Sequence, residues 1–115
     1  MIAWRWGLLL AAAAILPSCG RHHDHERVWV TVHNEGTVSA NIWSEAEYWS
    51  FAGEVNRELT VAPNETVQFS FSFENLNRLK VRIYRSTDAF KVFDDFWDHH
   101  DLEDLDERVT ITVVP

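Results

Sequence analysis

The segment TVQFSFSF, residues 66–73, alternates strictly between polar and apolar side chains. Successive side chains of a β-strand point to opposite faces, so this period of two predicts a strand with one buried face. Val67, Phe69, Phe71 and Phe73 share the apolar face. A fully buried side chain of this size stabilises a fold by about 1.5–3 kcal/mol, so the segment has to pack against a second apolar layer.

The same period of two recurs along most of the chain after residue 27, in short segments that polar turns separate. We expect about seven strands and no long helix, which is an all-β fold. The expected architecture is a single antiparallel β-sandwich, immunoglobulin-like or transthyretin-like, with an open barrel as the alternative. The expected strands are residues 28–33, 37–43, 55–61, 66–73, 78–85, 89–97 and 108–114.

The first connections along the chain allow two further expectations. Asn34–Gly36 is a turn sequence, so the strands 28–33 and 37–43 are expected to pair as a hairpin. Residues 44–54 lack the alternation of a strand, and we expect a loop or a short helical turn there.

Composition limits the classes of function that the chain can have. The net charge of -8 at pH 7 disfavours nucleic acid and anionic lipid as electrostatic partners. A single cysteine excludes a disulfide within the chain. The sequence contains no GxSxG nucleophile motif and no glycine-rich phosphate loop. We therefore expect a globular domain that is not an enzyme.

The first nineteen residues, MIAWRWGLLLAAAAILPSC, differ from the rest of the chain. Arg5 is their one charged residue, and it precedes an uninterrupted apolar run from Gly7 to Ile15. A helix that spans a bilayer needs roughly 20 apolar residues, so this run is too short for a membrane span. Its length and the preceding positive charge are typical of the signal helix of an exported protein.

Leu16, Pro17, Ser18 and Cys19 resemble the lipobox of bacterial lipoprotein precursors. The resemblance implies cleavage before Cys19, a diacylglycerol thioether on its sulfur and, usually, acylation of the new amino group. Several acyl chains make membrane anchoring stable. Gly20 stands where an aspartate would resemble an inner-membrane retention signal. In a cell with two membranes the outer membrane is therefore expected, on its periplasmic or surface face.

The implied organisation is a signal peptide over residues 1–18, a lipid-anchored tether over residues 19–27 and a sandwich over residues 28–115. Most of the tether, GRHHDHER, is polar and without periodicity, which is typical of a solvated spacer. Its histidines and acids can also bind zinc, copper or nickel. Both hypotheses stay open at this point.

The segment FDDFWDHHDLEDLDE, residues 93–107, combines many carboxylates with two adjacent histidines. Carboxylate oxygens suit calcium, and imidazole with a carboxylate suits a transition metal. The segment lacks the glycine and the acidic spacing of an EF-hand loop. A site for calcium or a transition metal in this segment is one hypothesis. The other is that the domain has no cofactor. The candidate ligands are Asp94, Asp95, Asp98, His99, His100, Asp101 and Asp104.

The competing hypothesis for this segment is structural. Asp101 precedes an acidic turn and is expected to be the N-cap of a short helix. Leu102 and Leu105 would then share one helix face and plug the end of the sandwich. The acids would face water or a basic stripe on a neighbouring strand. That stripe consists of Arg78, Lys80 and Arg82.

Four aromatic side chains form a candidate interaction surface. Trp and Tyr are common anchors at protein interfaces and at sugar-binding surfaces. The alternative is that these side chains cover an open end of the sandwich or pack under residues 44–54. They are Trp29, Trp43, Tyr48 and Trp49.

Together these features predict a lipid-anchored protein of the bacterial cell envelope, whose sandwich serves binding or structural support. Its expected partner is another envelope protein or a glycan. The alternative is an ion-binding envelope protein that uses residues 94–107 or the histidine-rich tether.

Overall fold

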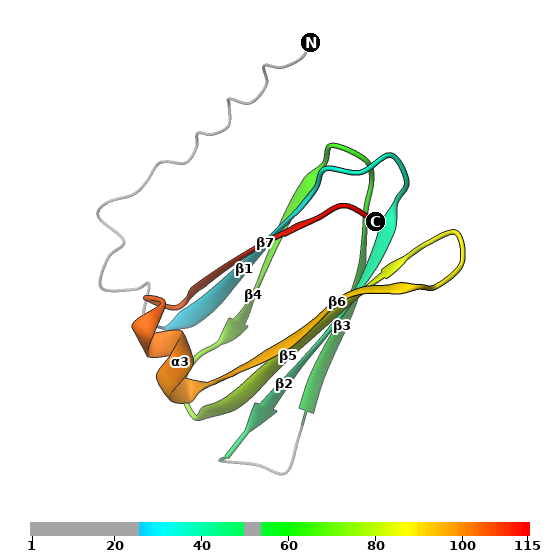
Figure 1. Ribbon diagram of the computed structural model, residues 1–115. Helices are drawn as coiled ribbons and strands as arrows, with labels where there is room; N and C mark the ends of the chain where they lie inside the picture. The colour runs from blue at the N-terminus through cyan, green and yellow to red at the C-terminus, as the bar shows by residue number, and fades with distance from the viewer. Residues whose placement is uncertain (1–25, 50–53) are drawn as a thin grey trace.

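The computed structural model describes residues 26–49 and 54–115 (Figure 1). The expected signal helix lies outside these residues, as does the tether up to residue 25. The described part of the chain contains seven strands and one short helix. Their bounds are β1 Arg27–Asn34, β2 Ala40–Tyr48, β3 Glu54–Val61, β4 Thr66–Ser72, β5 Leu76–Arg85, β6 Lys91–Asp98, α3 His99–Asp104 and β7 Arg108–Val113.

The strands form two sheets that pack face to face, so the expected all-β sandwich is confirmed (Figure 1). Sheet A has the strand order β4-β1-β7, and sheet B has the order β3-β2-β5-β6. Neighbouring strands are antiparallel except for β1 and β7, which run parallel. A parallel pair needs a long connection, and nearly the whole domain separates these two strands. The parallel pair thus joins the first and the last strand of the described domain.

The expected hairpin of β1 and β2 is wrong, because the two strands belong to different sheets. The connection crosses from sheet A to sheet B and is held by the fully buried side chain of Asn34. Asn34 Nδ2 donates to the carbonyls of Val38 at 2.9 Å and Val61 at 3.2 Å. Its Oδ1 accepts from the Gly36 amide at 2.8 Å. One amide side chain thus satisfies three backbone groups where the chain leaves sheet A.

The expected loop or helical turn over residues 44–54 is wrong for its first part, because β2 continues to Tyr48. Ser44 and Ala46 are buried and face the core between β3 and β5. Alternate residues of this part of β2 therefore face the core, as in any strand. The sequence does not show it, because the inward side chains are small and not strongly apolar. Residues 50–53 lie outside the described part of the chain.

The apolar faces of both sheets meet in one core, as the alternating segments predict. Leu59 is an exception, with 37% of its surface exposed, because β3 is an edge strand. Arg57 occupies the same face of β3 and places its guanidinium 5.1 Å from the centre of the Phe71 ring. The fully buried core residues include Val28, Val30, Val32, Ala40, Val61, Leu76, Leu79, Val81 and Ile83.

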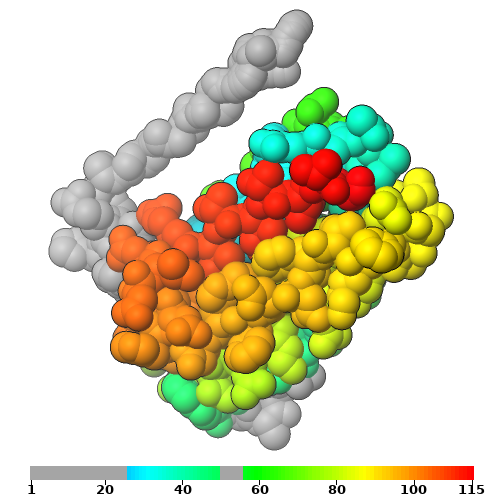
Figure 2. All heavy atoms as spheres, viewed as in Figure 1, coloured from blue at the N-terminus to red at the C-terminus, as the bar shows by residue number. Residues whose placement is uncertain are grey.

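The short helix α3 closes one end of the sandwich between β6 and β7 (Figures 1 and 2). Its N-cap is Asp98 and not the expected Asp101, which is the third helical residue. Asp98 Oδ1 accepts from the Asp101 amide at 2.8 Å, and Asp101 Oδ2 accepts from the Asp98 amide at 3.2 Å. This reciprocal capping box satisfies two amides of the helix N-terminus.

The two leucines of this segment have different environments, which corrects the expectation that both face inward. Leu102 is fully buried, whereas Leu105 is 44% exposed. After Leu105 the chain turns away through Asp106, which has a φ of 60°. The amides of Asp106 and Glu107 donate to the carbonyls of Glu103 and Leu102, as in a Schellman motif. The helix therefore ends at Asp104 with Leu105 as its C-cap, and Leu105 remains at the surface.

An ion pair holds the turn between β5 and β6. Arg85 donates to both carboxylate oxygens of Asp88, at 2.9 Å from Nε and 2.8 Å from Nη2. The Phe90 amide donates to the same carboxylate at 3.1 Å. These contacts, that of Arg85 first, lower the pKa of Asp88 from 3.8 to about 2.

We expect NMR titration of the Asp88 carboxyl to give a midpoint near 2, and the Arg85→Gln variant to return it toward 3.8. The folded-state pKa lies below the unfolded one. The stabilisation from this pair is therefore complete above about pH 4 and is lost as the pH falls toward 2. A midpoint that stays low in Arg85→Gln would show that Arg85 is not the main cause.

Candidate functional site

Cys19, the candidate lipidation residue, and the three histidines of the tether lie outside the described residues. Their roles in lipid attachment and metal binding stay predictions. Across residues 26–49 and 54–115, no helix has the length and apolar character needed to cross a bilayer.

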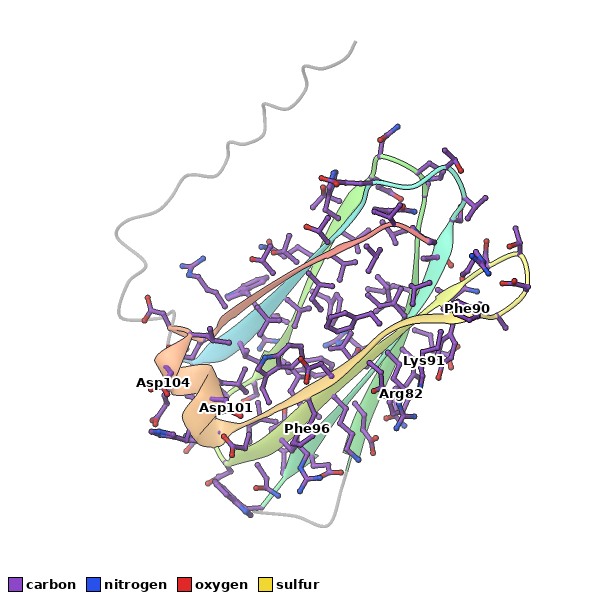
Figure 3. All side chains as sticks on the ribbon, viewed as in Figure 1. Arg82, Phe90, Lys91, Phe96, Asp101 and Asp104 are labelled. Atoms are coloured by element: carbon purple, nitrogen blue, oxygen red, sulfur yellow. The ribbon has the colours of Figure 1, made fainter. Side chains whose placement is uncertain are left out.

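The structure divides the candidate metal ligands between two elements. Three of them belong to β6, and four belong to α3. Asp94 and Asp95 are consecutive strand residues and therefore point to opposite faces of sheet B. Asp101 and Asp104 lie on α3 at the end of the sandwich, apart from Arg82 and Lys91 along the sheet (Figure 3). The seven carboxylates and imidazoles thus do not converge on one point.

Asp94 forms ion pairs with two basic side chains of sheet B. Lys91 Nζ lies 2.8 Å from one carboxylate oxygen of Asp94, and Arg82 Nε lies 3.5 Å from the other. The hydrogen bond from Lys91 is the main cause of the lowered pKa of Asp94. The expected contact between the acidic segment and the basic stripe is therefore confirmed for Arg82. Lys80 and Arg78 instead pair with Glu47 of β2, at 3.1 and 3.9 Å.

The two adjacent histidines occupy different environments. The His99 ring stacks on Phe73 with the ring centres 4.3 Å apart, and its Nδ1 donates to the Leu76 carbonyl at 2.7 Å. Only Nε2 of His99 remains available, 3.7 Å from the carboxylate of Glu103. The exposed His100 faces Asp104 at 3.6 Å. Each histidine thus pairs with the acid one helical turn later, which supports a structural role for this segment.

Within the described residues, no three side chains of histidine, cysteine, aspartate or glutamate come together as a metal site would require. The hypothesis of calcium or a transition metal at residues 94–104 therefore rests on the sequence and stays a prediction. Calorimetric titration of the full chain with calcium and with zinc tests it.

The four aromatic residues of the candidate interaction surface do not form one patch. Trp29 lies on the outer face of sheet A, and Trp43 lies on the outer face of sheet B. Tyr48 donates to the Ser72 carbonyl at 2.9 Å, and its partial burial raises its pKa. Trp49 is 62% exposed, with its ring 5.6 Å from that of His99 at the α3 end. Tyr48 and Trp49 thus lie at the covered end of the sandwich, whereas the two others lie on open sheet faces.

The outer face of sheet B carries aromatic rings covered by arginine side chains. The distances from each guanidinium carbon to the ring centre are close to 5 Å, within the range of cation–π attraction. Arg82 and Phe96 both lie along this sheet in Figure 3. On this face the pairs are Arg78 with Phe96 at 5.3 Å and Arg82 with Trp43 at 4.8 Å, and at the turn between β5 and β6 Arg85 lies 4.9 Å from the centre of the Phe90 ring.

A depression of about 820 Å³ lies around Trp43 on this face. The pairing register creates it, because Trp43 of β2 stands opposite Glu58 of β3 and Arg82 of β5. The next outward row places Asn41 between Thr60 and Tyr84. Two aromatic side chains, one carboxylate, one guanidinium, one amide and two hydroxyls, one of them on Tyr84, therefore line a single hollow. The lining side chains used below are Asn41, Trp43, Glu58, Thr60, Arg82 and Tyr84.

A second depression, of about 520 Å³, adjoins the first at the side of the sandwich where the edge strands β3 and β4 lie. Trp29, Gln68 and Ser70 line it from sheet A, and Arg57 lines it from β3. Glu58 and Leu59 of β3 line both depressions. Two of the aromatic residues expected at an interaction surface, Trp29 and Trp43, thus lie in adjacent hollows.

The sequence pattern does not single out Glu58, Asn41 or Gln68 as site residues. Each is a polar residue on the outward face of a strand, which is the ordinary place for such a residue. Only the pairing of β2 with β3 shows that Glu58 stands opposite Trp43. A correct prediction of that register is the one signal that would have identified it.

No protein-family model matches the chain, and no curated protein matches it. A solved structure described as "Trapped Toxin" aligns with 75% of this chain at 13% sequence identity and a TM-score of 0.45. The chain spans 21% of the length of that protein. A likeness of this degree carries no argument about function.

Proposed function

We propose that this protein is a lipid-anchored, non-enzymatic binding domain of the bacterial cell envelope. Its anchor is the cysteine of a lipobox-like sequence, and its partner is another envelope protein or a glycan. The position of Cys19 carries the proposal, because the single cysteine of the chain stands eight residues before Arg27, where β1 begins. The buried core lies within residues 28–113, so cleavage before Cys19 would leave it intact.

The place where the chain enters the domain supports an anchored orientation. The Glu26 carbonyl accepts from the Phe73 amide at 2.9 Å, and the Phe73 ring stacks on His99 of α3. The tether therefore joins the domain at the end that α3 covers (Figure 1). Eight extended residues reach about 26 Å at roughly 3.3 Å each. In this orientation the acidic α3 faces the membrane, repels anionic lipid and leaves both sheet faces accessible.

We expect Cys19→Ala to abolish incorporation of a labelled fatty acid and to move the protein from the membrane fraction to the soluble fraction. The thioether needs the cysteine sulfur, and without it no acyl chain holds the domain at the membrane. Labelling with an alkyne fatty acid in a bacterial host, followed by fractionation, measures both effects.

Ser18→Ala is the matched control, because alanine is also small and leaves the cysteine in place. This variant should be labelled and should fractionate as the unaltered protein does. Lack of label in the unaltered protein, or a Cys19→Ala form that remains with the membrane, would show that the proposed anchor is wrong.

A further inference from the structure

The two depressions meet at Glu58 and Leu59 and form a track across β3, called here the β3 track. One end lies around Trp43 on the outer face of sheet B. The other end reaches Trp29 on the outer face of sheet A. The track thus has a tryptophan on each side of the sandwich edge, which suits an extended ligand that contacts both hollows.

Polar groups with unused hydrogen-bonding capacity surround these tryptophans. Asn41 Oδ1 accepts from Thr60 Oγ1 at 3.1 Å, which leaves the Asn41 amide hydrogens without a partner among the described residues. The Glu58 carboxylate and the Tyr84 hydroxyl also have no hydrogen-bond or ion-pair partner in that part of the chain. Gln68 uses its Nε2 as a donor across sheet A, and its carbonyl oxygen remains an acceptor.

These groups match the chemistry of a sugar. A pyranose ring offers an apolar C–H face, which packs on an indole ring, and a rim of hydroxyls that both donate and accept. A planar amide or carboxylate can bind two neighbouring hydroxyls at once. Sugar hydroxyls can replace the waters on such exposed groups with little loss of hydrogen bonding.

The charge of the track favours a neutral ligand. Arg82 lies 3.5 Å from the Asp94 carboxylate, which also pairs with Lys91, and it covers one face of Trp43. Arg57 lies over the Phe71 ring. Glu58 adds a negative charge between them. A phosphorylated or strongly acidic ligand would require a cluster of unpaired cations, which the lining residues do not supply.

We propose that an extended, neutral oligosaccharide binds along the β3 track, with one sugar against Trp43 and another against Trp29. This inference rests on the proposed function, since an anchored envelope domain lies within reach of cell-surface glycans. Asn41, Glu58 and Gln68 bind the hydroxyls of the bound chain. Leu59, which lies between the two hollows, contacts the sugar that joins the two sugars bound at Trp43 and Trp29.

Calorimetric titration of the full chain, solubilised in mild detergent, tests the inference. The probes are the hexasaccharides and disaccharides of glucose, mannose, galactose and N-acetylglucosamine. We expect saturable binding of at least one hexasaccharide. The matching disaccharide should bind at least about tenfold more weakly, because it reaches only one hollow at a time.

Trp43→Ala and Trp29→Ala should each weaken hexasaccharide binding by about tenfold or more, as loss of a tryptophan anchor does. Trp49→Ala is the matched control, because this exposed tryptophan lies outside both hollows. The affinity of the Trp49→Ala variant for the hexasaccharide should stay within about twofold of that of the unaltered protein. Glu58→Ala removes an exposed carboxylate and should weaken binding without changing the melting temperature. This last variant keeps the test decisive if a tryptophan variant folds poorly.

Absence of binding by every hexasaccharide would overturn the inference. Binding that Trp43→Ala, Trp29→Ala and Glu58→Ala leave unchanged would also overturn it. Binding of an extended neutral decapeptide, without binding of any glycan, would assign the free edge of β3 to strand addition instead. Acyl labelling of Cys19 is measured separately. A labelled protein that binds no glycan therefore contradicts this inference alone, and a glycan-binding protein without label contradicts the anchor alone.

Discussion

Replacement of Leu102 by alanine is expected to lower the free energy of unfolding by about 2–5 kcal/mol. Leu102 is fully buried and is the core residue that α3 contributes between the two sheets. Truncation would remove its contacts and leave a cavity at the end of the sandwich. Urea denaturation of the full chain, followed by tryptophan fluorescence, measures the change.

Leu105→Ala provides the matched control, because Leu105 belongs to the same turn and is 44% exposed. Its substitution should change the free energy of unfolding by no more than about 0.5 kcal/mol. Equal losses in the two variants would mean that both leucines plug the core, and the described placement of α3 would then be incorrect.

The second large effect is expected at Asn34, where Asn34→Ala should lower the free energy of unfolding by about 2–4 kcal/mol. The substitution removes the partners of the Gly36 amide and of the Val38 and Val61 carbonyls, at a position where the side chain is fully buried. A buried polar group without a partner loses its hydration and gains nothing in return.

Asn41→Ala is the control for this experiment, because Asn41 is exposed on β2 and contacts only the Thr60 hydroxyl among the described residues. We expect a change of about 0.5 kcal/mol or less in the same urea measurement. If Asn34→Ala is as mild as Asn41→Ala, the crossover between the sheets does not depend on the buried amide.

The alternation of polar and apolar residues predicted the strands well, because the pattern that accompanies burial of one strand face is visible within a short segment of sequence. Val28, Val30 and Val32 face the core, and so do Phe69 and Phe71, as their spacing indicates. Arg57 interrupts the apolar face of its segment, and the structure explains it, since β3 is an edge strand.

Pairing between strands depends on contacts that the local pattern does not contain. Asn34 and Gly36 suit a tight turn, but the side chain of Asn34 directs the chain to the other sheet. The expected N-cap at Asp101 was wrong by three residues, because Asp98 and Asp101 are both good caps and together form one capping box. The position of Leu105 depends on the left-handed Asp106, where an aspartate takes the place usual for glycine.

The candidate site was predicted only in part, for the same reason. Trp29 and Trp43 stood out because tryptophan is a common anchor at protein interfaces and at sugar-binding surfaces. Glu58 did not stand out, because its importance comes from a register that places it opposite Trp43 and beside Leu59 at the join of the two hollows. The acidic segment attracted attention by composition, and its side chains are instead used in capping and in separate pairs.

Mass spectrometry of the N-terminal peptide, from protein purified out of bacterial membranes, tests the lipid anchor most directly. We predict a peptide that begins at Cys19 and carries a diacylglycerol thioether and an amide-linked acyl chain, without any peptide from residues 1–18. An unmodified Cys19, or a peptide in which residues 1–18 are still joined to it, would contradict the proposal of a lipid-anchored binding domain.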